Sequence, residues 1–171
     1  MAKFCPLFSS STGNSIYING GNDSVLIDIG MVNKQMEQSL WSIGVDADSI
    51  RNIFITHEHS DHVKGLKVFS KKHKARVFMT EGTYEALTKT DALDNVDECK
   101  IITPDGVDVG CMYIKPFAIS HDCIEPCGYT VQLANGRKIA IATDLGIMTD
   151  TVMNALKGAD LVMLESNHDV N

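Results

Sequence analysis

The sequence lacks any apolar run that approaches the roughly 20 residues of a membrane-spanning helix. Its longest apolar stretches, 138–143 and 159–164, are far shorter. The N-terminus has no long apolar segment followed by a small-residue cleavage site, so a secretory signal is not expected. No internal repeat or Pro/Gly/Ser-rich linker divides the chain. With 171 residues, 44% of them hydrophobic, we expect one domain over residues 1–171 with a substantial core.

Cysteine is scarce and its spacing is irregular. The five cysteines are Cys5, Cys99, Cys111, Cys123 and Cys127. An odd number at such spacings does not suggest a disulfide framework and suits a reducing compartment, so we expect a cytoplasmic protein. Cys123 and Cys127 are four residues apart, unlike a Cys-x-x-Cys pair, and we interpret them as packing or loop residues rather than a metal or redox site.

Basic residues are also in the minority. Lys and Arg number 15 against 22 Asp and Glu, a formal net charge of −7, which argues against broad nonspecific adhesion to nucleic acid. One segment departs from this balance, because residues 64–76 contain six of the basic residues and no acidic one. This run is either a local patch that receives an anionic substrate or a solvated helix face.

Hydrophobic periodicity predicts strands interleaved with helices, which is an α/β arrangement in layers. Strands are expected at 3–8, 15–19, 24–29, 52–56, 76–79, around 101, and at 107–109, 111–119, 128–134, 137–143 and 159–165, the last of them buried. Helices are expected at 33–43, 63–72, 81–89 and 150–157, the first with Asn33 as a possible cap. Asn135-Gly136 predicts a type I′ hairpin. Trp41 and the eight methionines are expected to fill core space.

The segment 57–62 carries the strongest chemical pattern. Three imidazoles and two carboxylates fall within six residues, directly after an apolar strand and before a helix. Imidazole nitrogen and carboxylate oxygen bind zinc and similar metals, and a strand-to-helix loop can turn His57, His59, Asp61 and His62 toward one point. Glu58 falls out of that phase and suits a supporting role. The alternative is a polar loop that caps the following helix, but capping does not require so many ligands.

This pattern resembles the His-x-His-x-Asp-His signature of the metallo-β-lactamase superfamily. The resemblance implies an αββα four-layer sandwich. It also implies a supporting aspartate at the end of an early strand, matched by Asp28, a later histidine ligand, matched by His121, and an aspartate that bridges two metals, matched by Asp144.

The full set of metal ligands implied by the resemblance falls into two groups. His57, His59 and His121 would hold the first ion, Asp61 and His62 would hold the second, and Asp144 would bridge them. The ions would be two divalent metals, with zinc favoured and manganese or iron as alternatives. Asp61 is also a catalytic candidate that orients the attacking hydroxide. His168, together with Glu165, is a candidate proton donor to the leaving group.

Five further segments narrow the resemblance. They are 9–15, 118–122, 127–129, 142–146 and 164–169. Together they resemble the bacterial YycJ/WalJ group of exonuclease-like hydrolases over nearly the whole chain, which implies a DNA substrate and hydrolysis of phosphodiester bonds by a water activated by two metals. That group has a last histidine ligand in a Gly-His-Leu-Ser-like segment, which does not occur before Asn171. We therefore expect the C-terminal part of the fold to be missing from this chain.

Two other functions remain open. A thioester or lactone hydrolase would use the same ligands, although Ser120-His121-Asp122 lacks the proline and glycine context typical of glyoxalase-like relatives. A β-lactamase is disfavoured, because a cytoplasmic protein would not meet the drug. A metal-stabilised binding or regulatory module without turnover is the second alternative, and comparing DNA hydrolysis with thioester hydrolysis would separate the three.

Overall fold

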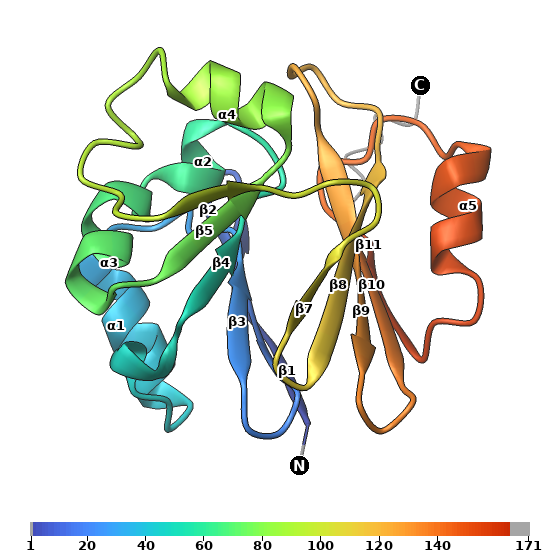
Figure 1. Ribbon diagram of the computed structural model, residues 1–171, viewed down its shortest axis with the longest axis horizontal. Coiled ribbons are helices and arrows are strands. Elements are labelled where there is room, and N and C mark those ends of the chain that lie inside the picture. Colours follow the sequence, from blue (N-terminus) through green and yellow to red (C-terminus); the bar gives the residue numbers. More distant parts are fainter. Residues whose placement is uncertain (1, 165–171) are drawn as a thin grey trace.

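Two β-sheets lie face to face, and helices cover the outer face of each (Figure 1). The computed structural model describes residues 2–164. Helices α1 to α4 lie against the first sheet and α5 against the second, so the four layers run helices, sheet, sheet, helix. The predicted αββα sandwich is confirmed. Within the described residues, no helix is both long and apolar enough to cross a bilayer.

The first sheet has six strands in sequence order. They are β1 (Lys3–Ser10), β2 (Gly13–Asn19), β3 (Ser24–Ile27), β4 (Asn52–Phe54), β5 (Arg76–Met79) and β6 (Cys99–Ile101). Strands β1 to β3 are antiparallel hairpins, and β3 to β6 are parallel. The helices on this side are α1 (Asn33–Ser42), α2 (Ser60–Val63), α3 (Leu66–His73) and α4 (Glu81–Leu87), with a short 3₁₀ turn at Ala47–Ser49.

The second sheet has five strands in the order β11-β10-β9-β8-β7. They are β7 (Val107–Val109), β8 (Met112–Ala118), β9 (Cys127–Leu133), β10 (Lys138–Ala142) and β11 (Leu161–Leu164), and α5 (Asp150–Leu156) precedes the last strand. Only β10 and β11 are parallel neighbours. The β9–β10 hairpin predicted at Asn135-Gly136 is confirmed, but the predicted type I′ turn is wrong, because Gly136 has a positive φ of 84° and Asn135 does not.

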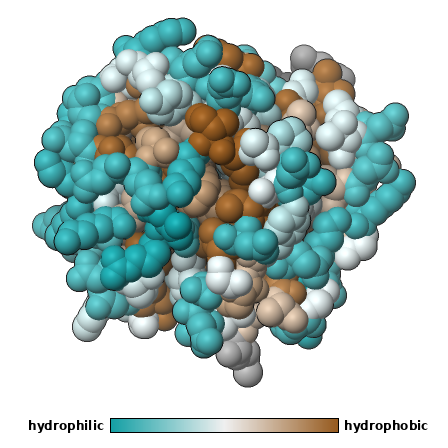
Figure 2. Space-filling view, in the orientation of Figure 1, coloured by the Kyte–Doolittle hydropathy of each residue, from teal (hydrophilic) through white to brown (hydrophobic). Residues whose placement is uncertain are grey.

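Alternating side chains of the first sheet enter two different cores, as a strand period of two requires. Ile16 and Ile18 of β2 are buried between the sheets, whereas Tyr17 packs among the side chains beneath the helices. In the layer between the sheets, the rings of Phe54 and Phe78 stack with centroids 4.7 Å apart. Figure 2 shows hydrophobic atoms gathered along the middle of one face, between hydrophilic flanks, over the line where the two sheets meet.

Several local predictions are wrong. Asn33 does not cap α1, because Val32 occupies the cap position and the Asn33 side chain donates to Glu37 instead. Trp41 is 79% exposed rather than part of the core. Of the methionines, Met148 and Met153 are exposed as well. The strand predicted as buried at 159–165 forms β11 at the sheet edge, where exposed and half-buried residues alternate.

The helix predicted at 63–72 is divided in two at Gly65. The backbone N–H of Gly65 donates to the carbonyl of Ile29 at 2.8 Å. A Cβ at this position would lie 2.3 Å from the Met31 carbonyl oxygen, so only glycine permits this approach. The break therefore lets the metal-loop helix α2 and the longer α3 pack closely against the end of β3.

Strands β4, β8 and β10 bring their carboxyl ends to one edge of the sandwich (Figure 1). β8 and β10 flank β9 and are both antiparallel to it, so they point the same way. Two hydrogen bonds join this edge to the loop after β4. The Cys127 N–H donates to the Thr56 carbonyl at 3.0 Å, and the Tyr129 hydroxyl donates to the Ile55 carbonyl at 2.6 Å. Residues that follow β4, β8 and β10 consequently meet.

Candidate metal centre

The loop after β4 is held in shape by Asp28, one residue beyond the end of β3. Its carboxylate accepts hydrogen bonds from the Thr56 backbone N–H and the Thr56 hydroxyl, both at 2.8 Å. The same carboxylate lies 2.8 Å from Nδ1 of His62. Asp28 is 1% exposed and has a left-handed φ of 60°. Such buried, fully used carboxylates in unusual backbone conformations are typical of functional sites, and these contacts agree with the supporting role predicted for Asp28.

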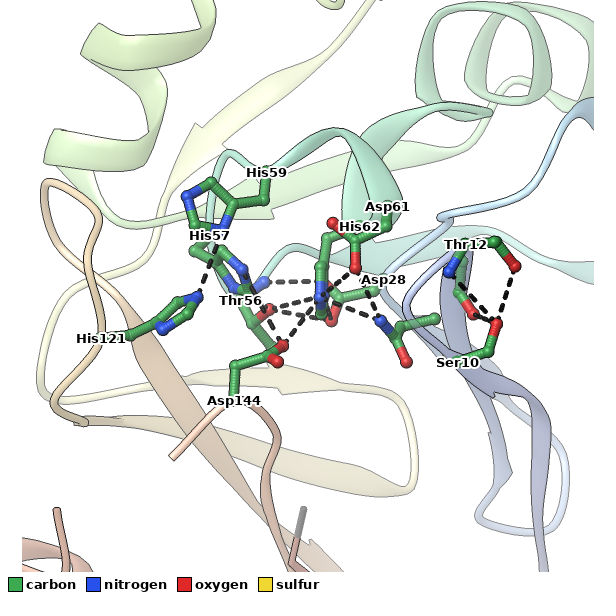
Figure 3. A network of polar contacts seen from close by, with 12 residues as sticks. Ser10, Thr12, Asp28, Thr56, His57, His59, Asp61, His62, His121 and Asp144 are labelled. Carbon is green, nitrogen blue, oxygen red and sulfur yellow. Dashed lines mark hydrogen bonds and ion pairs between the residues drawn. The ribbon is translucent and has the colours of Figure 1, made fainter. Parts of the chain in front are cut away.

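Three histidines form a first cluster. His57 and His59 come from the β4–α2 loop, and His121 comes from the loop after β8 (Figure 3). One nitrogen of each ring lies within 4.8 Å of the others, and Nδ1 of His59 is 3.2 Å from Nε2 of His121. Ligand nitrogens at about 2.0–2.1 Å from a tetrahedral zinc ion lie roughly 3.3–3.4 Å apart. The spacing therefore suits an ion at the centre of this cluster.

The electrostatics of His57 favour the neutral ring that a metal requires. His57 is fully buried, and its Nδ1 contacts the Thr56 hydroxyl at 2.9 Å. Nε2 is buried and has no hydrogen-bond partner in the described part of the chain. Burial, followed by the neighbouring His62 and His121, lowers the pKa of His57 to about 3. A neutral imidazole with an unshared buried lone pair is a fit site for a metal bond.

A second cluster joins His57, His62 and Asp144. Nε2 of His62 lies 2.8 Å from Oδ2 of Asp144 and 3.5 Å from Oδ2 of Asp61. Burial opposes protonation of His62, but the carboxylates of Asp28 and Asp144 outweigh it and raise its pKa to about 10. The hydrogen bond from His62 lowers the pKa of Asp144 against the opposing effect of burial. Asp144 follows β10 and also has a left-handed φ, 52°.

The structure brings all six predicted ligands to the same edge. The two clusters share His57, whose Nε2 is 4.0 Å from Oδ2 of Asp144. The alternative of a helix-capping loop is not supported, because His59 occupies the cap position of α2 without a side-chain capping hydrogen bond. The predicted proton donors His168 and Glu165 lie outside the described residues.

Two further polar residues lie at this site. The sequence pattern gave Asn14 no role in metal binding and gave Glu58 only a general supporting role. Asn14, at the start of β2, is 6% exposed, and its Nδ2 lies 3.1 Å from both Asp61 Oδ2 and His62 Nε2. Asn14 belongs to a Ser-Thr-Gly-Asn segment that resembles the family, but this resemblance did not predict that Asn14 contacts the metal loop. Glu58, expected to support the site, accepts a hydrogen bond from the Ile124 backbone N–H at 2.9 Å. That bond ties the metal loop to the loop of His121.

Three of the six basic residues at 64–76 contact acidic or amide side chains. Lys67 forms ion pairs with Asp91 and Asp94 at 3.3 and 3.0 Å, and Lys72 pairs with Glu37 at 2.7 Å. Lys71 donates to the side chain of Asn95. Nearby acidic residues from other segments thus offset charges that look isolated in the sequence. This favours the interpretation as a solvated helix face over that of a free patch for an anionic substrate.

Comparison with known proteins identifies the family to which this chain belongs. The sequence pattern of the beta-lactamase superfamily domain matches residues 14–169. The chain belongs to the metallo-β-lactamase superfamily. It is 34% identical over 168 residues to exodeoxyribonuclease YycJ of Bacillus anthracis and 32% identical over 171 residues to exodeoxyribonuclease WalJ of Streptococcus pneumoniae. Each match covers 98% of this chain, which spans 63% of the length of these curated relatives.

Solved structures with low sequence identity to this chain share its fold. A metallo-β-lactamase of Cronobacter sakazakii with a HARLDQ motif superposes with a TM-score of 0.74 at 14% identity, covering 94% of this chain and 76% of that one. Zn²⁺-bound PqqB from Methylobacterium extorquens also gives 0.74, at 16% identity, covering 90% and 60%. These likenesses support the fold assignment alone.

Proposed function

We propose that this protein is a metal-dependent hydrolase that cleaves phosphodiester bonds of DNA, in the manner of an exonuclease. The observation that carries the proposal is the pair of ligand clusters that meet at His57, with Nε2 of His57 and Oδ2 of Asp144 only 4.0 Å apart. Two adjacent ions are the arrangement that suits phosphodiester hydrolysis. The relatives named exodeoxyribonuclease support DNA as the substrate partner.

In this proposal six residues hold two divalent ions, with zinc favoured over manganese or iron. His57, His59 and His121 would hold one, Asp61 and His62 would hold the other, and Asp144 would contribute to both. The donor set fits such ions, because it combines imidazole with carboxylate and includes a buried atom, His57 Nε2, that has no hydrogen-bond partner among the described residues. When bound, the two ions supply a water of lowered pKa and stabilise negative charge on the departing oxygen.

The chain's own groups position the reactants. Thr56 and Asp28 fix the rings of His57 and His62 through their Nδ1 atoms, which leaves both Nε2 atoms facing the site. Asp61 is the group that we expect to orient the attacking hydroxide. His168, with Glu165, remains a proposed proton donor to the leaving oxygen. The five free cysteines accord with the proposed cytoplasmic location.

The test measures metal content and hydrolysis together. We expect close to two metal ions per chain by mass spectrometry, and metal-dependent shortening of an end-labelled single-stranded oligonucleotide with added manganese. His59→Ala should abolish cleavage while leaving the folding measured by circular dichroism intact. A thioester and a lactone, assayed in parallel, separate the proposed nuclease from a hydrolase of the same fold. Hydrolysis of either in preference to DNA would overturn the nuclease assignment, and two bound metals without hydrolysis of any substrate would favour a binding module.

A further inference from the structure

The amide of Asn14 lies at the second ligand cluster, on a strand that carries none of the six predicted ligands. Its Nδ2 is 3.1 Å from Asp61 Oδ2 and 3.1 Å from His62 Nε2, which are themselves 3.5 Å apart. Donor atoms at about 2.1 Å from one ion lie roughly 3.0–3.4 Å apart for octahedral to tetrahedral angles. The terminal amide of Asn14 therefore occupies a corner of the polyhedron that an ion between Asp61 and His62 would have.

The position of Asn14 is fixed by close backbone packing rather than by a flexible side chain. The N–H of Gly30 donates to the Asn14 carbonyl at 2.8 Å. A Cβ on Gly30 would lie 1.6 Å from the Asp61 carbonyl oxygen and 2.4 Å from the Asn14 nitrogen, so these three segments meet where only glycine fits. The start of β2 is thereby held directly against the metal loop (Figure 3).

Among the described residues, only the nitrogen of the Asn14 side-chain amide has hydrogen-bond partners. Oδ1 of Asn14 is buried and has no hydrogen-bond partner in the described part of the chain. Nδ2 makes both contacts, one to the Asp61 carboxylate and one to the His62 ring nitrogen Nε2. His62 Nδ1 contacts Asp28, so Nε2 is the atom of this ring that faces the second site.

We propose that Asn14 is a ligand of the second metal ion through Oδ1, an inference that rests on the proposed two-metal site. An ion held by Asp61 and His62 Nε2 would lie beside Asn14 Nδ2, which is 3.1 Å from both ligand atoms, and an N–H cannot point at a cation. Rotation of the amide by about 180° around its soft terminal torsion exchanges the two atoms and breaks no hydrogen bond at Oδ1. The exchanged Oδ1 would repel the Asp61 carboxylate unless a cation lay between them, so rotation and metal binding are linked.

An amide oxygen changes the character of this second site. Carbonyl and carboxylate oxygens suit manganese and magnesium, whereas imidazole and thiolate suit zinc. The first metal site would offer three imidazoles, and the second metal site, made by His62, Asp61, Asp144 and Asn14, would offer one imidazole, two carboxylates and one amide oxygen. The two sites should therefore differ in preference, with zinc favoured at the first and manganese competing better at the second.

The experiment titrates Mn²⁺ into the zinc-loaded first site and measures the second equivalent by calorimetry, with Mn²⁺ electron paramagnetic resonance as a check on bound ion. Asn14→Ala should weaken the second equivalent by at least about tenfold and leave the first unchanged. Asn14→Asp keeps an oxygen donor and should bind the second equivalent at least as well as the parent. Asn19→Ala, at the other end of β2, is the matched control and should change neither. Thermal unfolding verifies that each variant is folded.

The outcomes separate this inference from the proposed function. If the parent chain binds no second ion, both are overturned. If the parent binds two ions and Asn14→Ala binds them equally well, only the role of Asn14 is overturned. If Asn14→Asp is as weak as Asn14→Ala, the amide acts by donating Nδ2–H to Asp61 and is not a ligand, which also overturns the inference.

Discussion

The carboxylate of Glu58 reaches across from the metal loop and accepts the backbone N–H of Ile124 at 2.9 Å. Ile124 lies in the same loop as His121, three residues further along the chain. A single hydrogen bond thus links two loops that otherwise belong to different sheets. The same two loops carry His59 and His121, whose facing nitrogens are 3.2 Å apart.

Removal of this link should loosen the first metal site. Glu58→Ala loses the acceptor for Ile124, and we expect zinc affinity of the three-histidine site to fall by about tenfold, in the range found for residues that support ligands. Glu58→Gln retains a side-chain oxygen and should lose much less. Affinity is measured by competition with a chromophoric chelator. Glu85→Ala, an exposed glutamate of α4, is the control, and equal losses in Glu58→Gln and Glu58→Ala would show that charge rather than the hydrogen bond matters.

Substitution of Asp28 should affect both folding and metal binding. Its carboxylate accepts from two groups of Thr56 and contacts His62, and its φ of 60° suits Asp and Asn better than Ala. Asp28→Asn keeps the backbone preference and one oxygen, so we expect a loss of about 1–2 kcal/mol in unfolding free energy. Asp28→Ala should lose roughly 3 kcal/mol or more, because it also adds backbone strain. Urea unfolding compares the two variants, and an equal loss would contradict the role assigned to backbone strain.

Many residues of the candidate site could be predicted from the sequence, because they are close together in the chain or directly follow a strand. His57, His59, Asp61 and His62 occupy one loop, and His121 and Asp144 each follow a strand of the second sheet. Asn14 was not predicted as a site residue, because its position depends on backbone packing around Gly30 that no local pattern encodes. The pairing of Lys67 was missed for a similar reason, since Asp91 and Asp94 lie on a separate segment. Trp41 was misplaced because helical spacing identifies the buried face only approximately, and Leu40 occupies it instead.

The exposure of Trp41 gives a direct test of the helix layer. Phe69 of α3 is fully buried, whereas Trp41 of α1 is 79% exposed. Phe69→Ala should lower the unfolding free energy by about 3–5 kcal/mol, as is usual for a buried ring. Trp41→Ala should change it by less than about 1 kcal/mol. Chemical denaturation followed by far-ultraviolet circular dichroism avoids dependence on the tryptophan signal. A large loss for Trp41→Ala would mean that this side chain is covered in solution.

Glu37 should make stability depend on pH in the acid range. Its carboxylate accepts hydrogen bonds from Lys72, at 2.7 Å, and Asn33, at 2.8 Å, and the Lys72 bond is the largest cause that lowers its pKa from 4.5 to about 2. Because the folded pKa lies below the unfolded one, the contribution is fully present above about pH 4.5 and is lost as the pH falls towards 2. The pair is near the surface, so the contribution at neutral pH is about 1 kcal/mol. Glu37→Gln should be less stable than the parent in urea at pH 7, and this difference should shrink at pH 3. A difference that stays constant between these two values would show that ionisation of Glu37 does not contribute to stability.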